Sequence, residues 1–416
     1  MTSREHVRNV PASEFVIVVA PFVLGAALVV GWPRVRRTPI WKLALYPLAL
    51  TPIIAAAEWS AAASASGRLL WMEVFWAVYF VIAWRLAWAV WTRTVGRIGE
   101  KRRRWARLVR RRPETTRREQ RVASLCRLIA PARVLCTLLV FVPLVAGSLI
   151  HRFKIGNAPA VERVPELPVE EVRFRTGDGL SLSGWFAAEP GSDATVVICH
   201  GLGANKSNFA DFLRLFCGQG YSALIFDFRG HGDSDGHTST FGLLESRDVT
   251  AAVTWLKRER PAQAVHVYGI GSSMGAMALV RSAADDTRIE AVVLDSLFAG
   301  VPMMADTHVG RLPVVGPLLG HLIIASMSLH AGRSLWALDA RPAIAAISPR
   351  PVLLIQGDDD VLIPPESLDV LYAAAAQPKA RWLAPGPHSN IMSTDFHEYQ
   401  RRVLAFLDLA NAHAPR

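Results

Sequence analysis

The chain has 416 residues, which is more than one ordinary domain needs, and 51% of them are hydrophobic. The net charge of +11 is unevenly placed: residues 1–150 carry 23 Lys and Arg against 7 Asp and Glu, whereas residues 151–416 carry 23 against 28. The basic character therefore belongs to the N-terminal part, which argues against a nucleic-acid partner for the chain as a whole. The cysteines show no spacing typical of a metal site or a disulfide framework, so we expect them to be packing residues. They are Cys126, Cys136, Cys199 and Cys217.

Four apolar segments in the first 150 residues predict membrane-spanning helices. The first is uncharged from Phe15 to Trp32, close to the ~17–25 residues that a span needs. It lacks a clean signal-peptide cleavage site, which favours a retained span. The other three are less uniform, because the second contains two prolines and the third and fourth contain charged residues. They cover residues 43–57, 69–91 and 128–150.

A strongly basic segment, residues 93–127, separates the third and fourth apolar segments and contains 14 Lys and Arg. Such a segment is typical of nucleic-acid or anionic-lipid binding, or of a cytoplasmic loop in a membrane protein. Its place between two apolar segments favours the cytoplasmic loop. With the basic loop 34–42 also in the cytoplasm, four spans place everything after residue 150 outside it. We therefore expect an integral protein of the cell membrane with an extracytoplasmic C-terminal region.

Residues 151–168 read as a linker, and the pattern then changes to alternating strands and helices. Alternation at 171–175 and 180–186 around Asp178-Gly179 predicts a hairpin. Short continuous apolar segments predict strands buried on both faces. Strands alternating with helices predict a mostly parallel sheet with helices on both faces. The expected strands are 195–199, 222–226, 265–268, 291–294, 351–355 and 381–383, and the expected helices are 209–219, 243–258, 274–284 and 366–376.

The strand at 265–268 leads into the pattern G-x-S-x-G, with Ser273 at its centre. This pattern predicts a sharp turn between strand and helix that exposes the serine hydroxyl. Gly271 and Gly275 are expected because a side chain at either position would clash where the strand and the helix nearly touch.

Two other strands end in Gly-rich turns. After 195–199 comes His200-Gly201-Leu202-Gly203, a loop suited to supplying a backbone N–H to an oxyanion, with the Leu202 amide as donor. The Met274 amide, next after Ser273, is the expected second donor. We expect the His200 side chain to hold this loop rather than to act in catalysis. The Asp227–Gly236 turn contains Asp, His and Ser, and we interpret it as a turn whose side chains bond to backbone.

The strand at 351–355 leads into three consecutive carboxylates, Asp358, Asp359 and Asp360. Adjacent residues point in different directions and no EF-hand spacing follows, which argues against a cation site. One carboxylate that orients an imidazole is the better interpretation. The turn Pro385–Asn390 then brings His388 toward the same edge of the sheet.

Residues from about 170 to 410 resemble an α/β-hydrolase, through five motifs in order. They are H-G-x-G at 200–203, D-x-R-G-x-G-x-S at 227–234, G-x-S-x-G at 271–275, G-x-x-D-x-x-x-P at 357–364 and, as the counterpart of the terminal G-x-x-H turn, Gly386-Pro387-His388. The resemblance implies a Ser273 nucleophile, an Asp360 acid, four before Pro364, and a His388 base, with Leu202 and Met274 as oxyanion donors. It implies no metal and no cofactor. The resemblance does not cover the N-terminal membrane region.

The residues from Asp295 to Arg350 form a long insertion where this fold often carries a cap. Its Met- and Leu-rich composition fits a lid over an apolar substrate or ordinary helix packing. The resulting hypothesis is a membrane-anchored serine hydrolase of carboxylic esters, including lipid esters or thioesters, with a small-molecule or lipid ester and the bilayer as partners. A peptidase or amidase remains an alternative, and the presence of all three triad residues argues against a non-catalytic scaffold. The natural substrate and the oligomeric state stay open.

Overall fold

The computed structural model describes residues 143, 168–236, 238–310, 312 and 315–412. The four predicted membrane segments, apart from residue 143, lie outside these residues, as do the basic segment 93–127 and the linker up to residue 167. Within the described ranges, no helix combines the length and the hydropathy that crossing a membrane requires.

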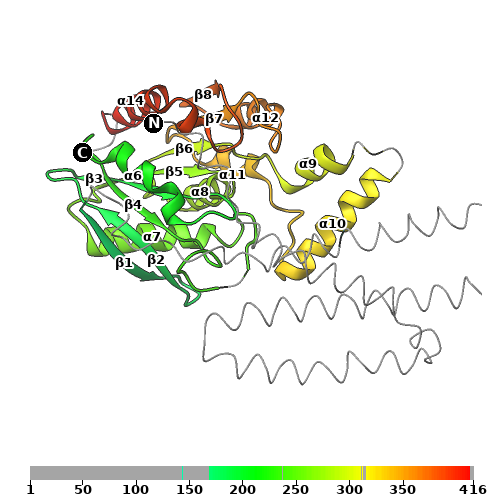
Figure 1. Ribbon diagram of the computed structural model, residues 1–416, viewed down its shortest axis with the longest axis horizontal. Coiled ribbons are helices and arrows are strands. Elements are labelled where there is room, and N and C mark those ends of the chain that lie inside the picture. The colour runs from blue at the N-terminus through cyan, green and yellow to red at the C-terminus, as the bar shows by residue number, and fades with distance from the viewer. Residues whose placement is uncertain (1–142, 144–167, 237, 311, 313–314, 413–416) are drawn as a thin grey trace, which may run out of the picture. The chain divides into compact units, whose positions relative to one another are not determined.

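Eight strands form one sheet in the order β1-β2-β4-β3-β5-β6-β7-β8 (Figure 1). β1 and β2 form the predicted antiparallel hairpin, and β2 also pairs antiparallel with β4. All other neighbouring strands are parallel, which confirms the predicted mostly parallel sheet. The strands are β1 (Val169–Arg175), β2 (Ser181–Ala187), β3 (Ala194–Cys199), β4 (Ser222–Phe226), β5 (His266–Ser272), β6 (Ala291–Asp295), β7 (Val352–Gly357) and β8 (Lys379–Ala384).

Two apolar layers sandwich the sheet, and this explains why its strands read as continuous apolar segments. In β3, Val197 and Cys199 belong to one layer, whereas Val196 and Ile198 belong to the other, as the two-residue period of a strand requires. Helices α7, α8, α11 and α12 cover the first layer, and α6 and α14 cover the second. These helices are α6 (Ala210–Phe216), α7 (Ser246–Glu259), α8 (Met274–Asp285), α11 (Ala340–Ala346), α12 (Glu366–Ala374) and α14 (Phe396–Ala412).

The structure differs from the sequence-based expectation in two places that matter for the site. β5 continues to Ser272, beyond the expected end at residue 268, so the strand carries the chain directly to Ser273. The C-terminal helix α14 was not expected at all. It buries Tyr399, Val403 and Leu407 against the sheet. Two short elements, the 3-10 helix η5 (Lys206–Phe209) and α13 (Ile391–Thr394), complete the turns around the site.

The insertion between β6 and β7 divides into two parts with different roles. Helix α9 (Val301–Ala305), the π-helical turn η6 (Asp306–Gly310) and helix α10 (Gly316–Ala331) extend away from the sheet (Figure 1). Helix α11 instead packs against α8 and α12, and its Ile344 is fully buried. The two interpretations of the insertion therefore apply to different segments, because only the part before α11 extends out over the site.

Candidate active site

Ser273 occupies a strained turn between β5 and α8. Its φ is +53° and its ψ is −116°, a conformation that non-glycine residues rarely adopt. The Ser273 N–H donates to the backbone oxygen of Asp295 at 2.9 Å, which holds the turn in place. A Cβ at Gly275 would lie 2.2 Å from the Cys199 backbone oxygen, and one at Gly271 would lie 2.7 Å from backbone atoms of the turn. Both glycines are therefore required by close backbone approach, as the G-x-S-x-G pattern predicts.

The structure brings Ser273, Asp360 and His388 together at one edge of the sheet, after the carboxyl ends of β5, β7 and β8. His388 Nε2 lies 3.0 Å from Ser273 Oγ, and His388 Nδ1 lies 2.7 Å from an Asp360 carboxylate oxygen. Of the three consecutive carboxylates, Asp358 and Asp359 are exposed and Asp360 is buried. Asp360 is thus the carboxylate that contacts the imidazole, which is the residue that the resemblance selected.

The Asp360 carboxylate accepts four hydrogen bonds, which fix its orientation. One oxygen accepts from the Leu362 and Ile363 backbone N–H groups at 2.9 and 2.8 Å. The other accepts from the Gln356 amide at 2.7 Å as well as from His388. Sequence reasoning missed Gln356. The available signal was its position at the end of a buried strand directly before the acid loop.

A second buried acid, Asp295, links the nucleophile turn to the histidine turn, and sequence reasoning also missed it. Its carboxylate accepts hydrogen bonds from Ser296 Oγ at 2.8 Å and from Tyr399 of α14 at 3.0 Å. Ser296 Oγ in turn accepts from the Ser389 N–H, next to His388, at 3.2 Å. Burial raises the pKa of Asp295 to about 6. Ser296 and Ser389 both have a φ of +53°, so strained backbone is concentrated around the site.

The loop that carries Leu202 is held by the neighbouring turn after β4. His200 Nε2 accepts from the Phe228 N–H at 3.1 Å, and His200 Nδ1 bonds to the Gly201 oxygen. Burial lowers the pKa of His200 to about 3, so its imidazole is neutral and suited to these two bonds. The expectation that His200 holds the loop agrees with these contacts.

A cluster of buried charged side chains holds the residues that follow this loop. Lys206 Nζ contacts Asp227 at 2.7 Å and Asp233 at 2.8 Å, and the Lys206 N–H donates to Asp227. Lys206 and Asp227 are almost fully buried. Ser234 Oγ donates to the Asp227 backbone oxygen. Side chains of the 227–234 turn therefore bond to backbone groups and to the Lys206 side chain, in line with the sequence-based interpretation of this turn as one held by side-chain bonds to backbone.

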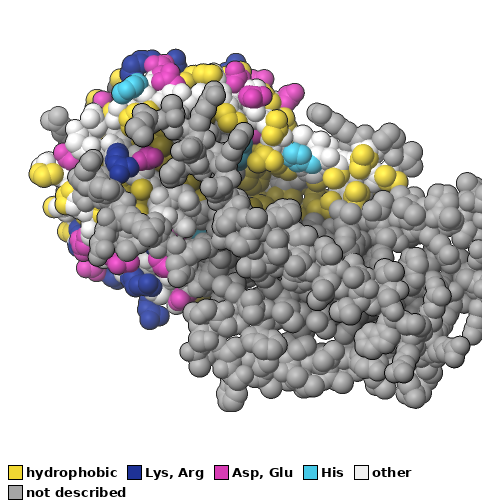
Figure 2. All heavy atoms as spheres, viewed as in Figure 1, with side chains coloured by type: hydrophobic (Ala, Val, Ile, Leu, Met, Phe, Trp, Pro, Cys, Tyr) yellow, Lys and Arg dark blue, Asp and Glu magenta, His cyan; other side chains and the backbone are white. Residues whose placement is uncertain are grey.

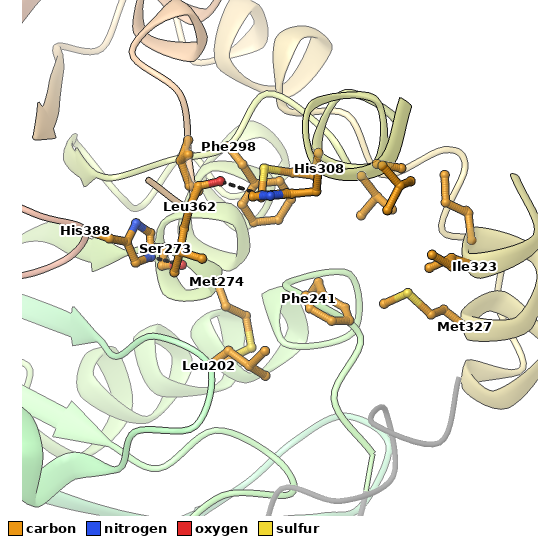
Figure 3. A pocket seen from close by; sticks show the side chains of 16 residues that line it. Leu202, Phe241, Ser273, Met274, Phe298, His308, Ile323, Met327, Leu362 and His388 are labelled. Carbon is orange, nitrogen blue, oxygen red and sulfur yellow. Dashed lines mark hydrogen bonds between the residues drawn. The ribbon is translucent and has the colours of Figure 1, made fainter. Parts of the chain in front are cut away.

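An apolar cavity of about 340 Å³ opens in front of Ser273 (Figure 3). Ser273 and His388 lie at one end, and Ile323 and Met327 of α10 lie at the other. Leu202 and Met274, the two expected oxyanion donors, both line it. The remaining lining residues are Phe241, Phe298, Val301, Met304, Ala305, His308, Val309, Ile324, Leu362 and Ile363.

One hydrogen bond joins the cap to the acid loop at this cavity. His308 of η6 bonds through Nε2 to the Leu362 backbone oxygen at 2.9 Å (Figure 3). Leu362 lies two residues after Asp360, so the cap is connected to the same loop that orients the imidazole.

Comparisons with known proteins agree with this architecture. Residues 190–327 match a family model described as serine aminopeptidase, S33. The Mycobacterium tuberculosis protein Rv2307c is 31% identical over 247 residues, which cover 58% of this chain and 79% of that protein. The Bacillus subtilis protein YqkD is 32% identical over 241 residues, which cover 56% and 77%.

A solved structure also agrees with this architecture. The Pyrococcus furiosus esterase Pf2001 superposes with a TM-score of 0.50 at 26% identity, covering 62% of this chain and 98% of the esterase. The chain is therefore a hydrolase of the α/β-hydrolase fold, and it belongs to the family that includes the M. tuberculosis and B. subtilis proteins.

Proposed function

We propose that the protein is a membrane-anchored serine hydrolase that cleaves carboxylic esters with an apolar acyl group. One observation carries this proposal: hydrogen bonds join Ser273 to His388 and His388 to Asp360, and Ser273 lies at one end of an apolar cavity. A hydroxyl within hydrogen-bond reach of an imidazole, itself oriented by a buried carboxylate, is the arrangement that activates serine as a nucleophile.

The reaction proceeds in two halves. His388 Nε2 takes the proton from Ser273 Oγ while the oxygen attacks the ester carbonyl, and Asp360 stabilises the imidazolium that forms. The Leu202 and Met274 N–H groups stabilise the oxyanion. Met274 is the first residue of α8, where N–H groups have no acceptor within the helix and the helix dipole favours negative charge. His388 protonates the leaving alcohol, and water then hydrolyses the acyl-enzyme by the same route.

The cavity favours an acyl group over an amino-terminal peptide. An aminopeptidase needs a carboxylate to pair with the substrate ammonium group. None of the described residues that line the cavity is Asp or Glu. A volume of about 340 Å³ corresponds to roughly eleven water volumes at ~30 Å³ each, which fits an acyl chain of about ten carbons. The esterase among the structural neighbours supports the same choice.

Labelling with a serine-reactive fluorophosphonate tests the nucleophile. We expect the wild-type full chain to be labelled and the Ser273→Ala variant not to be labelled, with Ser272→Ala as the matched neighbour control. Equal labelling of wild type and Ser273→Ala would refute the assignment. Matched p-nitrophenyl esters and anilides then separate esterase from amidase activity, and faster anilide cleavage would favour the peptidase or amidase alternative.

The membrane anchor rests on the apolar segments and the basic segment of the first 150 residues. We propose that they place the hydrolase domain outside the cytoplasm. A membrane-impermeant fluorophosphonate applied to intact cells should label Ser273 without lysis. Labelling only after lysis would contradict this orientation while leaving the serine hydrolase proposal intact.

A further inference from the structure

Helix α10 presents apolar residues on two opposite sides. Its sequence from Gly316 to Ala331 contains no Asp, Glu, Lys or Arg. At 100° per residue, Ile323 and Met327 lie on the side that lines the cavity. Leu318, Leu322, Ala325 and Leu329 follow one another at i, i+4, i+7 and i+11 on the opposite side, and we name these four residues the outer stripe.

The outer stripe is apolar and mostly exposed: Leu318, Ala325 and Leu329 are exposed and Leu322 is half-buried, with exposed His321 beside them. Leu318 is 52% exposed and Leu329 is 80% exposed. In Figure 2, apolar side chains gather where α9 and α10 lie. A helix with no charged residue and with apolar residues on two opposite sides is typically buried or in contact with lipid. The cavity accounts for the inner side of α10, and the outer stripe is the side that lipid would contact.

The residues around the stripe match the composition of a membrane interface. Trp336 is 38% exposed, and its ring lies 4.9 Å from the ring of His321, which adjoins the stripe. Exposed Arg333 follows the helix, and no Asp or Glu occurs from Thr307 to Leu338. Trp and Arg are enriched where apolar surface meets lipid headgroups, and the absence of acids suits anionic headgroups.

Two lengths bear on how α10 could contact a membrane: that of the helix and that of the linker before β1. Sixteen residues give about 24 Å of helix, less than the ~30 Å of a hydrocarbon core, so α10 fits a position along a membrane surface better than a span across it. The last predicted span ends at residue 150, and β1 begins at Val169. The intervening residues reach about 60 Å at most, so the proposed anchor would keep the start of β1 within about 60 Å of the bilayer.

We propose that the outer stripe of α10 inserts into the bilayer at the boundary between headgroups and acyl chains. The cavity then opens behind a helix whose far side contacts lipid, and an acyl chain leaving the bilayer passes along apolar surface. This inference rests on the membrane attachment proposed above for the position of the domain. It does not rest on the catalytic role of Ser273.

Site-specific quenching in the full chain tests the contact. Leu329→Cys, in a background where Cys126, Cys136 and Cys217 are replaced by Ser, is labelled with the fluorophore NBD in phosphatidylcholine–phosphatidylglycerol nanodiscs. We expect acyl-chain nitroxide lipids to quench this label several-fold more than aqueous iodide. Leu409→Cys on α14, which is 64% exposed, is the control and should show the reverse order.

Two results would overturn the inference. Iodide quenching at position 329 equal to that at position 409 would place the stripe in water. Shielding from both quenchers would mean that protein covers the stripe. Extraction with alkaline carbonate tests the tether separately: retention of the chain in the pellet with an iodide-quenched label at 329 overturns only the stripe contact, whereas release of the chain overturns the anchor as well.

A charge variant gives a functional readout that a damaged fold would not imitate. In the full chain, Leu318→Asp with Leu329→Asp should lower hydrolysis of a long-chain ester in vesicles at least tenfold. Hydrolysis of a short, water-soluble ester should stay within twofold, because neither residue lines the cavity. Leu409→Asp should change neither rate. Equal loss on both substrates, or no loss on the vesicle substrate, would contradict the proposal.

Discussion

Replacing Asp360 by Asn turns one carboxylate oxygen into an NH₂ group, which reverses the hydrogen bond to His388 and removes the acceptor of the Gln356 amide. One Asp360 oxygen faces the Leu362 and Ile363 N–H groups, which are obligate donors. The amide oxygen of the introduced Asn is therefore held on that side, and its NH₂ faces His388 Nδ1. His388 must then keep Nδ1 unprotonated and carry its proton on Nε2, where it donates to Ser273 Oγ and no longer accepts from it.

The expected cost follows from the loss of the general base. A histidine held in the wrong tautomer lowers kcat by about 10⁴ in a Ser-His-Asp site, or about 5 kcal/mol of transition-state stabilisation. Binding contacts in the cavity are unchanged, so KM should move by less than about threefold. The assay is steady-state hydrolysis of a p-nitrophenyl octanoate by the full chain in detergent.

The neighbouring carboxylates provide matched controls. Asp359→Asn changes an exposed side chain one residue away and should leave kcat within about twofold. A kcat for Asp360→Asn within tenfold of wild type would refute the assigned role of Asp360. So would a loss in Asp359→Asn as large as that in Asp360→Asn.

Three other features lead to predictions. In a series of esters, each added acyl methylene that enters the cavity should raise kcat/KM up to about fourfold, until the chain reaches about ten carbons. Met327→Ala should move this limit to longer acyl chains, and a kcat/KM that does not depend on chain length would contradict the acyl site. Because the folded pKa of Asp295 is about 6 against about 3.9 unfolded, wild type should lose about 2 kcal/mol of stability relative to Asp295→Asn as pH rises from 4 to 7. A pH-independent difference in denaturant unfolding would disprove that shift. Lys206→Met leaves Asp227 buried without its ion-pair partner and should lower the free energy of unfolding by about 3–5 kcal/mol. Arg214→Met, in an exposed ion pair, is the control and should lower it by under about 1 kcal/mol; similar losses would argue against the buried cluster.

Local sequence predicted the parts of the site that depend on chain direction. The strand Ala194–Cys199, the turn at Ser273 and the acid loop each follow from a short pattern with one physical cause, such as the glycine that a close backbone approach requires. The order of the parallel strands at one edge then brought Ser273, Asp360 and His388 to the same place.

One of the contacts that sequence reasoning missed is a long-range one. Tyr399 reaches Asp295 across 104 residues of chain, and nothing local to either residue signals this bond. Helix α14 was missed together with Tyr399, although Asp395 precedes its first residue as an N-cap and accepts a hydrogen bond from the Glu398 N–H at 3.1 Å. The division of the insertion between cap and core was also hidden, since α10 and α11 are both apolar and only packing separates them.

The buried cluster of Lys206, Asp227 and Asp233 has a consequence for how such a protein diversifies. It fixes the Leu202 loop through groups that lie in the sheet-bound part of the chain, and α9 and α10 contribute no atom to it. The loop that carries the Leu202 amide is therefore held by groups outside the cap, whereas α9 and α10 supply part of the cavity wall. Under the proposed function, we expect substitutions in α9 and α10 to change which ester enters the cavity while Ser273, His388 and Asp360 stay in place.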